Sequence, residues 1–442
     1  MHSIRTRRPA PVSALFATTL GLAAAFAPMA LAQTPPPVQT GTPGNPATAP
    51  AEKTYQAPAN LGEWASSIKF GVQVEGGITG NPQDPRNHRN FGSLTTDNAN
   101  HPVLNQALFT VSRDVDPKAT SVDVGFKLQA LYGSDARIYQ TEGVLDQLIH
   151  DRNQLAIIEA SVSARFPGLF ANGTDVKAGI FPTPLGFETI DPKTNTFYSH
   201  SYIFNYGLPF KETGVLATAH VSDLVDVYLG ISSGNETFIG YGTGDNNNRP
   251  SGIVGFGLNF YGGDLTVLAL SHIGPENSKR NTPFANSAIR YFNDVVVNWK
   301  TTPKLTLSLE GNYVREDGFR AEGWGLTGYA TYAVSDTVSV AGRAEVFRDN
   351  NNFYVSNPAG NLDYINSIRG VQTNFITASR ATTYSEFTLG LQYKPTWLPK
   401  MLSTGVIRPE VRYDQALNSS HPFNDGRQYG SVTLASDFIL GF

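Results

Sequence analysis

The chain has 442 residues, with 33 lysines and arginines, 37 aspartates and glutamates, and no cysteine. The charge is slightly negative and no basic stripe stands out, so a nucleic-acid partner is excluded. After residue 32 no apolar run approaches the roughly 18–20 residues of a membrane-spanning helix, which excludes a helical membrane protein. Without cysteine, an exported chain of this sequence would fold without disulfides.

The N-terminal segment has the features of an export signal. A basic stretch at 5–8 precedes an apolar stretch, and the small residues A-L-A at 30–32 form a cleavage site. We therefore predict a signal peptide over residues 1–32, the alternative being a retained membrane anchor. Residues 33–60 are rich in proline, threonine, glycine and alanine and lack a hydrophobic period, which predicts a disordered periplasmic tether.

Segments of about ten residues with alternating apolar and polar side chains recur from Trp64 to the C-terminus. In one of them, Leu305, Leu307 and Leu309 alternate with threonine, serine and glutamate. A period of two residues is typical of a β-strand with one apolar face. The spacers separate sixteen such strands.

The spacers alternate strictly between short and long, with a long one first and last. Seven are short or tight and rich in the turn formers glycine, proline and aspartate. Eight are mostly long, at about 78–103, 134–153, 183–212, 234–251, 274–289, 315–323, 349–382 and 415–428. This alternation predicts an all-β fold over residues 61–442: a transmembrane antiparallel β-barrel of about sixteen strands, with short periplasmic turns and long extracellular loops.

A large soluble β-sandwich would show a similar alternation of side chains. The export signal, the alternating loop lengths and the length of the strands favour a membrane barrel, whose strands cross about 25 Å of hydrocarbon. The last strand ends on Phe442, with no polar cap after it. This ending resembles the C-terminal insertion signal of outer-membrane barrels, which implies recognition by the barrel assembly machinery.

One stretch of the sequence is more specific than the strand pattern. Residues 178–223 contain P-x-G-F-E, then D-P, N-x-F-Y-S and P-F-x-x-T-G-V. This stretch resembles the OmpL-like family of β-barrel porins, and from about residue 66 to 442 the resemblance is carried by the strand pattern alone. It implies an outer-membrane channel without a cofactor. The motif is structural, so no site residues are carried over from the family.

The polar side chains of barrel strands face the lumen, where water solvates charges that a packed core would not accommodate. The candidate pore-lining residues are Lys127, Glu159, Arg165, Glu310, Arg343, Glu345, Arg408, Glu410 and Arg412. Both signs of charge are nearly balanced along the predicted wall, so no ion preference is predicted. Arg408 and Arg412, with Glu410 between them, either favour anionic solutes or form ion pairs that stiffen the barrel.

The third long spacer, at 183–212, is the candidate constriction. In sixteen-stranded porins the third outer loop folds into the lumen, and resemblance to that architecture implies that Glu188, Asp191 and Lys193 line the constriction. The alternative is a loop that lies on the rim or packs under its own aromatic residues. The same architecture implies a homotrimer.

No catalytic or metal-binding constellation stands out in the sequence. Ser271 and His272 are adjacent on a strand and therefore point to opposite faces, so they cannot act together. The asparagine-rich segments 244–250 and 348–354 lack the spacing of a calcium-binding loop. We predict no enzymatic activity, no metal and no cofactor.

These features predict an outer-membrane porin that passes small hydrophilic solutes by passive diffusion and contacts outer-membrane lipid. Two alternatives stay open. One is a substrate-specific channel for a sugar or an organic acid. The other is a barrel that its own loops plug and that serves as a structural or adhesive surface protein.

Overall fold

The computed structural model describes residues 60–240, 244–399 and 402–442, which fall within one compact unit. The predicted signal peptide at 1–32 and all but the last residue of the predicted tether at 33–60 lie outside the described residues. Among the described helices, none is both long enough and apolar enough to span a membrane.

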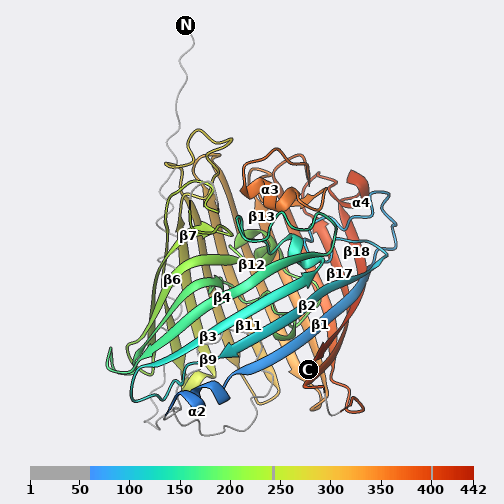
Figure 1. The fold of residues 1–442 in the computed structure, drawn as a ribbon. Helices are drawn as coiled ribbons and strands as arrows, with labels where there is room; N and C mark the ends of the chain where they lie inside the picture. The colour runs from blue at the N-terminus through green and yellow to red at the C-terminus, as the bar shows by residue number, and fades with distance from the viewer. Residues whose placement is uncertain (1–59, 241–243, 400–401) are drawn as a thin grey trace, which may run out of the picture. The chain divides into compact units, whose positions relative to one another are not determined.

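Sixteen of the described strands close into one antiparallel barrel, as the sequence predicted (Figure 1). Around the barrel the order follows the chain, except that β13 pairs directly with β16, and β1 pairs with β18 to close the ring. The barrel strands are β1 (Lys69–Gly80), β2 (Pro102–Arg113), β3 (Asp123–Gly133), β4 (Gln154–Phe166), β5 (Thr174–Pro182), β6 (Lys211–His220), β7 (Val225–Asn235), β8 (Ser251–Phe260), β9 (Leu265–Gly274), β10 (Arg290–Lys300), β11 (Leu305–Glu316), β12 (Ala321–Ala333), β13 (Val338–Asp349), β16 (Thr382–Tyr393), β17 (Thr404–Ala416) and β18 (Gly430–Gly441).

Shorter elements lie between the strands. Helix α2 (Leu61–Ser66) precedes β1 at the end of the barrel where the chain also terminates (Figure 1). At the opposite end, the loop between β13 and β16 folds into a two-stranded sheet and a helix (Figure 1). The other elements are η1 (Asp135–Arg137), η2 (Pro192–Thr194), η3 (Ile203–Gly207), η4 (Tyr261–Gly263), β14 (Ser356–Pro358), α3 (Asp363–Ile368), β15 (Phe375–Thr377) and α4 (Phe423–Gly426).

The alternation of side chains decides which face of each strand points outward. On β11, Leu307 and Leu309 are exposed on the outer surface, whereas Ser308 and Glu310 are buried toward the lumen. Strands with an apolar outer face and a polar inner face are the reverse of those in a soluble β-protein and suit a barrel surrounded by lipid.

The loops reproduce the predicted alternation of short and long connections, with one difference. The spacer predicted at 315–323 is a connection of only four residues, at 317–320. Strands β11 and β12 extend further than the sequence indicated, because Glu316 still pairs with Ala321 in the ladder. The sequence analysis assigned the charged and glycine residues at the ends of these two strands to a loop. At the other end, Gly262 and Gly263 both adopt the left-handed conformation that a tight β8–β9 hairpin requires.

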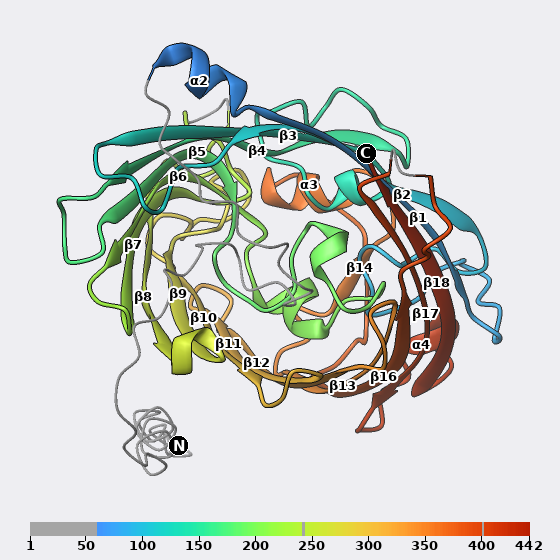
Figure 2. The same cartoon turned by 90° about the horizontal axis from the view of Figure 1, so that it is seen from below.

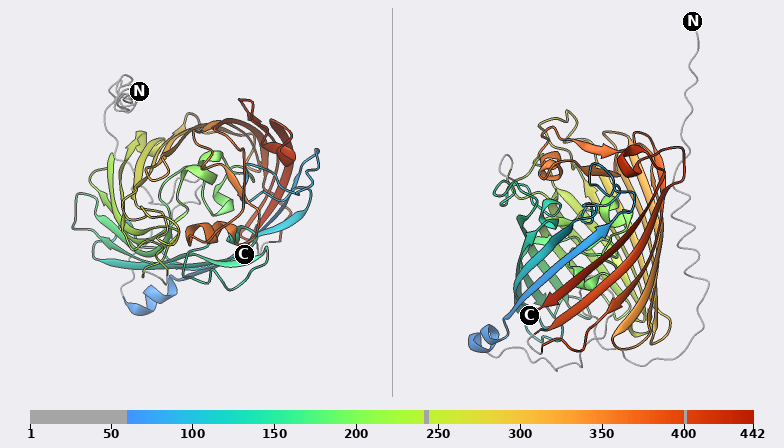
Figure 3. Two further views of the ribbon diagram at one scale, coloured as in Figure 1. Left: turned by 90° about the horizontal axis from the view of Figure 1, so that it is seen from above. Right: turned by 90° about the vertical axis from the view of Figure 1, so that its right-hand side faces the viewer.

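Residues 183–210, which connect β5 to β6, fold into the barrel and are called the inner loop below. Views along the barrel axis place this segment within the ring of strands (Figures 2 and 3). Its aromatic and aliphatic side chains form a buried cluster with residues of other long loops, which include Phe91, Leu94, Tyr139, Val355 and Phe423. The apolar core of this molecule therefore lies inside the barrel, where the loops shield one another from water.

Candidate functional site in the barrel lumen

The inner loop is held through its backbone, and carboxylates of the barrel wall accept its N–H groups. Glu345 on β13 accepts hydrogen bonds from the N–H of Tyr202 at 2.6 Å and of Ile203 at 2.9 Å. Glu410 on β17 accepts from the N–H of Tyr198 at 2.9 Å and of Ser199 at 3.2 Å. Charge-assisted bonds of this kind are about twice as strong as neutral ones, so they fix the path of the loop.

A second pair of carboxylates binds the first turn of the inner loop. Asp294 on β10 accepts from the N–H of Gly186 at 3.1 Å, and Glu310 on β11 accepts from the N–H of Phe187 at 3.0 Å. Gly186 has a φ of 91°, and a Cβ atom here would lie 2.3 Å from Leu208 Cδ1. The positive φ therefore favours glycine at this position of the P-x-G-F-E motif, and a Cβ atom would also displace the end of the Leu208 side chain.

Arginines of the wall donate to the carbonyl groups of the same loop. Arg408 Nη1 lies 2.8 Å from the carbonyl oxygen of Pro192, and Arg412 Nη1 lies 2.6 Å from that of His200. Arg408 also pairs with Asp437 and with Glu75, at 2.5 and 3.0 Å. Both arginines are buried in ion pairs, Arg412 with an aspartate of its own strand, and neither has a side chain open to the lumen.

Glu188, a predicted constriction residue, is buried and points toward the barrel wall. Its carboxylate lies 2.8 Å from Arg343 Nη1 and 2.8 Å from His200 Nδ1, and it accepts the N–H of Ser201 at 3.0 Å. Burial alone would raise the pKa of Glu188, but the Arg343 charge and the His200 hydrogen bond hold this pKa at about 2. Glu188 therefore stays ionised and joins the loop to β13.

Asp191 and Lys193, the other two predicted constriction residues, lie on the part of the inner loop that water reaches. Asp191 caps η2 by accepting the N–H of Lys193 at 3.2 Å, and its carboxylate also accepts Gln73 Nε2 at 2.9 Å. The Lys193 ammonium pairs with the same carboxylate at 3.2 Å. These two side chains present charge to the solvent inside the barrel.

On the wall formed by β3, β4 and β5, the Glu159 carboxylate forms ion pairs with two lysines. Lys127 Nζ and Lys177 Nζ each lie 3.0 Å from one of its carboxylate oxygens. Toward the short-turn end of the same strands, Arg165 pairs with Asp175 at 3.0 Å. All the predicted pore-lining residues therefore carry side chains on the inner side of the barrel, but most of them bind the inner loop or one another.

Sequence reasoning had not singled out several residues that bind the inner loop. Gln392 Nε2 donates to the carbonyl oxygens of Asn195 and Thr196, and Asn312 Nδ2 donates to that of Gly207 at 3.1 Å. These uncharged amides occupy lumen-facing positions of their strands. The alternation of polar and apolar residues along each strand could therefore have identified them as lumen-facing.

The asparagine-rich segments use their aspartates to bind backbone N–H groups. Asp245 accepts from the N–H of Asn247 and of Asn248, at 2.9 and 2.6 Å. Asp349 accepts from the N–H of Tyr354 and of Val355, both at 3.0 Å. Among the described residues no group of three or more histidine and acidic side chains is arranged to hold a metal ion.

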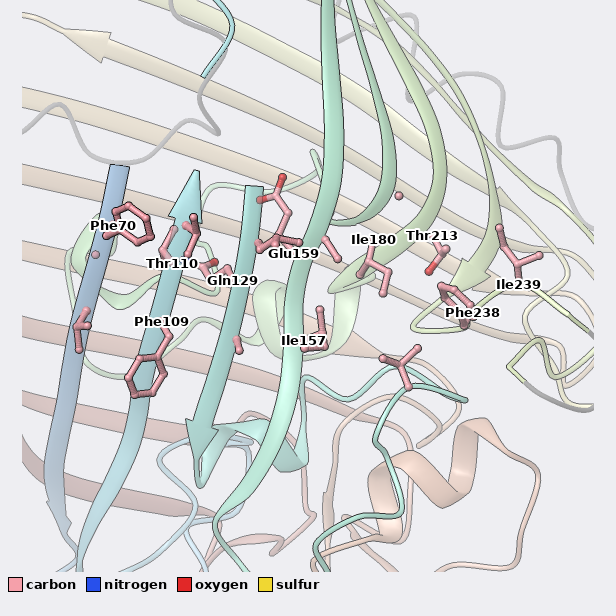
Figure 4. Close-up of a pocket in the computed structure, with 18 of the residues that line it drawn as sticks. Phe70, Phe109, Thr110, Gln129, Ile157, Glu159, Ile180, Thr213, Phe238 and Ile239 are labelled. Carbon is pink, nitrogen blue, oxygen red and sulfur yellow. Dashed lines mark hydrogen bonds between the residues drawn. The ribbon is translucent and has the colours of Figure 1, made fainter. Parts of the chain in front are cut away.

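A groove of about 1040 Å³ lies on the outer surface of β1 to β6 (Figure 4). Phe70 and Phe109 lie at one end of it and Phe238 and Ile239 at the other (Figure 4). Phe70, Phe109 and Ile239 are strongly exposed, as expected for side chains that face lipid. The groove opens on the lipid-facing side, although Glu159, whose carboxylate binds Lys127 and Lys177, is also among the residues that line it (Figure 4).

Comparison with known families decides how this barrel is classified. Residues 67–442 match the family model described as "Putative beta-barrel porin-2, OmpL-like". The chain belongs to this family. It is an outer-membrane porin channel, and family and fold point to a channel rather than to an enzyme. The match extends over the whole barrel, beyond the short motif that first indicated the resemblance. No curated protein matches this porin.

Solved porins share the fold of this porin at very low sequence identity. OmpF of Salmonella typhi, in complex with daunomycin, has a TM-score of 0.52 at 9% identity, with 85% of this chain and 97% of that chain covered. The outer-membrane channel DcaP of Acinetobacter baumannii has a TM-score of 0.50 at 11% identity, with coverages of 85% and 97%. An anion-selective porin from Comamonas acidovorans has a TM-score of 0.50 at 9% identity, with coverages of 85% and 99%.

Proposed function

We propose that this porin passes small hydrophilic solutes by passive diffusion through the space between the inner loop and the facing barrel wall. The observation that carries the proposal is the attachment of the inner loop inside the barrel. Carboxylates and arginines of the wall hold its backbone, so the loop narrows the lumen at a fixed position. A fixed loop of this kind selects solutes by size without a conformational cycle.

The constriction would be lined by Asp191 and Lys193 on the loop side and by Lys127 and Lys177 on the wall side. These four charged side chains are partly exposed to solvent. Glu188, which belonged to the predicted constriction, would act instead as an anchor, because its carboxylate is buried against Arg343.

The test is the conductance of the purified, refolded protein in a planar lipid bilayer, combined with the swelling of proteoliposomes in sugars of increasing size. Discrete ohmic steps and a swelling rate that falls smoothly with solute size are expected. A folded barrel that gives neither steps nor swelling would contradict the proposal.

The large apolar cluster favours a second candidate, a narrower and substrate-specific channel. The inner loop shares this cluster with other long loops, which leaves less space in the upper lumen for water. A channel of this type would show a flux that saturates with the concentration of one solute, whereas diffusion gives a flux that stays proportional to concentration. Swelling rates over a range of concentrations therefore distinguish the two candidates.

We further propose that the protein has no enzymatic activity and works as a homotrimer in contact with outer-membrane lipid. The apolar outer surface supports the lipid contact. Export would depend on residues 1–32, and insertion would depend on the barrel assembly machinery acting on Phe442. Cross-linking of the protein in native outer membranes would test the trimer, and a monomer alone would contradict it.

A further inference from the structure

The charges inside the barrel divide into two groups according to their access to water. One group lies between the inner loop and the barrel wall, and its members bind the backbone of the loop or pair with other buried charges. The members of this group are all nine-tenths or more buried, and they are Glu75, Glu188, Asp294, Glu310, Arg343, Glu345, Glu386, Arg408, Glu410, Arg412 and Asp437. Because loop and wall atoms cover these side chains, a solute in the lumen does not contact them.

The second group reaches water, and its most exposed members at the level of the inner loop are lysines. The side chains of Lys127, Lys177 and Lys193 are 35%, 40% and 50% exposed. Their acidic partners are less accessible, at 3% for Glu159 and 22% for Asp191. The near balance of charge in the sequence therefore does not describe the surface that a solute meets.

The geometry of the wall site leaves positive charge in excess. Lys127 and Lys177 lie on either side of Glu159, each 3.0 Å from it, so two ammonium groups face one carboxylate. Ser161 donates a further hydrogen bond to Glu159 at 2.8 Å, which also turns this carboxylate toward the wall. The net charge of the site is +1, and it is carried by the two exposed ends.

The loop site is neutral in sum but asymmetric in exposure. The Asp191 carboxylate is directed toward β1, where Gln73 donates to it at 2.9 Å, while half of the Lys193 side chain is open to solvent. An ion that passes the inner loop therefore approaches the ammonium group more closely than the carboxylate.

Other exposed charges near the lumen do not reverse this excess. At the short-turn end, Lys69 pairs with Asp114 at 2.7 Å, and Arg165 pairs with Asp175 at 3.0 Å. Asp175 also contacts His220 Nε2 at 3.2 Å. The acidic side chain is the more exposed one in both pairs, at 71% against 57% and at 17% against 8%. Each pair nevertheless contains one charge of each sign in contact, so its net field along the channel is small.

We propose that Lys127, Lys177 and Lys193 make this channel selective for small anions. The inference rests on the proposed function, since it needs an open channel. It names the solute class: inorganic anions and small carboxylates or phosphates, which lysine ammonium groups attract as point charges. The buried arginines Arg408 and Arg412 position the inner loop and do not select ions.

The test is the reversal potential of the refolded protein in a planar bilayer under a gradient of potassium chloride at low salt, where screening is weak. In water, one unit charge about 7 Å away changes the local concentration of a monovalent ion about threefold. One positive charge raises the local chloride concentration and lowers the local potassium concentration by this factor. The wild-type channel should therefore prefer chloride over potassium by about sevenfold at low salt, and by less where salt screens the charge.

Two variants separate the lysines from the fold. K127Q/E159Q/K177Q removes a net charge of +1 and leaves no unpaired buried carboxylate. K193Q removes the positive charge of the loop site and leaves the Asp191 carboxylate. Each should lower the chloride preference, and both together should bring it close to unity or reverse it. E159Q alone should raise the preference. K118Q changes an exposed lysine in the β2–β3 turn, outside the lumen, and is the matched control.

The outcomes are distinguishable. A conducting wild type that prefers potassium, or lysine variants that keep the chloride preference, would overturn the inference and leave the channel function intact. A folded wild type without conductance would overturn the proposed function and the inference with it.

Discussion

Arg343 on β13 and Glu188 on the inner loop form a buried ion pair, with 2.8 Å between Nη1 and Oε1. The same guanidinium also pairs with Glu386 on the neighbouring strand, at 3.0 Å from Nε, and donates to the carbonyl oxygen of Ser199 at 2.8 Å. One side chain thus connects two barrel strands to two points of the loop. Because all these groups are buried, loss of the arginine leaves Glu386 without its paired cation, and it leaves Glu188 with His200 and the N–H of Ser201 among its remaining donors.

Replacement of Arg343 by methionine should therefore destabilise the barrel strongly. It leaves Glu188 and Glu386 buried without their cation, and breaking a buried pair in this way costs about 3–5 kcal/mol. The measurement is the denaturant midpoint of the refolded protein in detergent micelles. The triple variant R343M/E188Q/E386Q, which removes the unpaired charges, should recover much of the loss. A cost below about 1 kcal/mol for R343M alone would contradict the role of the pair.

The attachment of the inner loop predicts a change in protease sensitivity. Glu345→Ala removes the acceptor for two backbone N–H groups, those of Tyr202 and Ile203, so the aromatic part of the loop should separate from the wall more often. Chymotrypsin should then cleave the inner loop several-fold faster than in the wild type. Mass spectrometry of the fragments would locate the cut.

The control for Glu345→Ala is Glu322→Ala. Glu322 lies on β12, on the opposite parity to the lumen-facing residues, and contacts Tyr313 at 3.2 Å. Its loss should leave cleavage of the inner loop unchanged. Equal acceleration in both variants would indicate general loosening of the barrel and would contradict a specific anchor at Glu345.

The strands were predictable because the period of two is a local property of the sequence. The alternation of Leu307 and Leu309 with polar residues predicts the outer face of β11 without information from the rest of the chain. The connection at 317–320 was less predictable, because strand length depends on the partner: Glu316 stays in the sheet through its pairing with Ala321. Local signals mark where a strand runs more reliably than where it ends.

The orientation of the inner loop could not be read from the sequence. Glu188 contacts Arg343 across 155 residues, and Tyr202 contacts Glu345 across 143. Nothing local distinguishes Glu188, which is buried, from Lys193, which is exposed. The period of two predicts that Arg343 and Glu345 face the inside of the barrel, whereas for the loop charges a position on the rim stayed open. The access of these charges to water is decided by contacts between distant segments.

Asp135 in η1 should make stability depend on pH. Burial raises the pKa of this carboxyl to about 6, above the value of about 3.9 in an unfolded chain. The folded state therefore binds more protons than the unfolded state between these values, so stability falls as pH rises from about 4 to 6. Above pH 6 the full penalty, about 2–3 kcal/mol, is present.

The substitution Asp135→Asn should remove this penalty. Gln106 donates Nε2 to Asp135 at 3.0 Å, while Gln106 Oε1 is buried without a hydrogen-bond partner among the described residues. A rotated Gln106 amide accepts a hydrogen bond from the new side-chain amide, at the cost of the bond from Gln106 Nε2 to the carbonyl oxygen of Ile190, which is 3.0 Å long. D135N should raise the denaturant midpoint at pH 8 and leave it nearly unchanged at pH 4. A lower midpoint at pH 8 would show that the ionised carboxylate stabilises the fold.

Phe442 should matter for assembly in the cell more than for the stability of the finished barrel. Its backbone N–H donates to the carbonyl oxygen of Val72 at 2.8 Å, but half of its side chain is exposed at the outer surface. Phe442→Ala keeps the backbone bond, so the stability of the refolded protein should change by less than about 0.5 kcal/mol. If the side chain is the insertion signal, the amount of heat-modifiable barrel in outer-membrane fractions should fall several-fold.

Phe438→Leu, at another exposed aromatic of β18, is the control and should leave that amount unchanged. Normal assembly of F442A would refute the signal, and an equal loss in refolding from urea would place the effect in the fold itself.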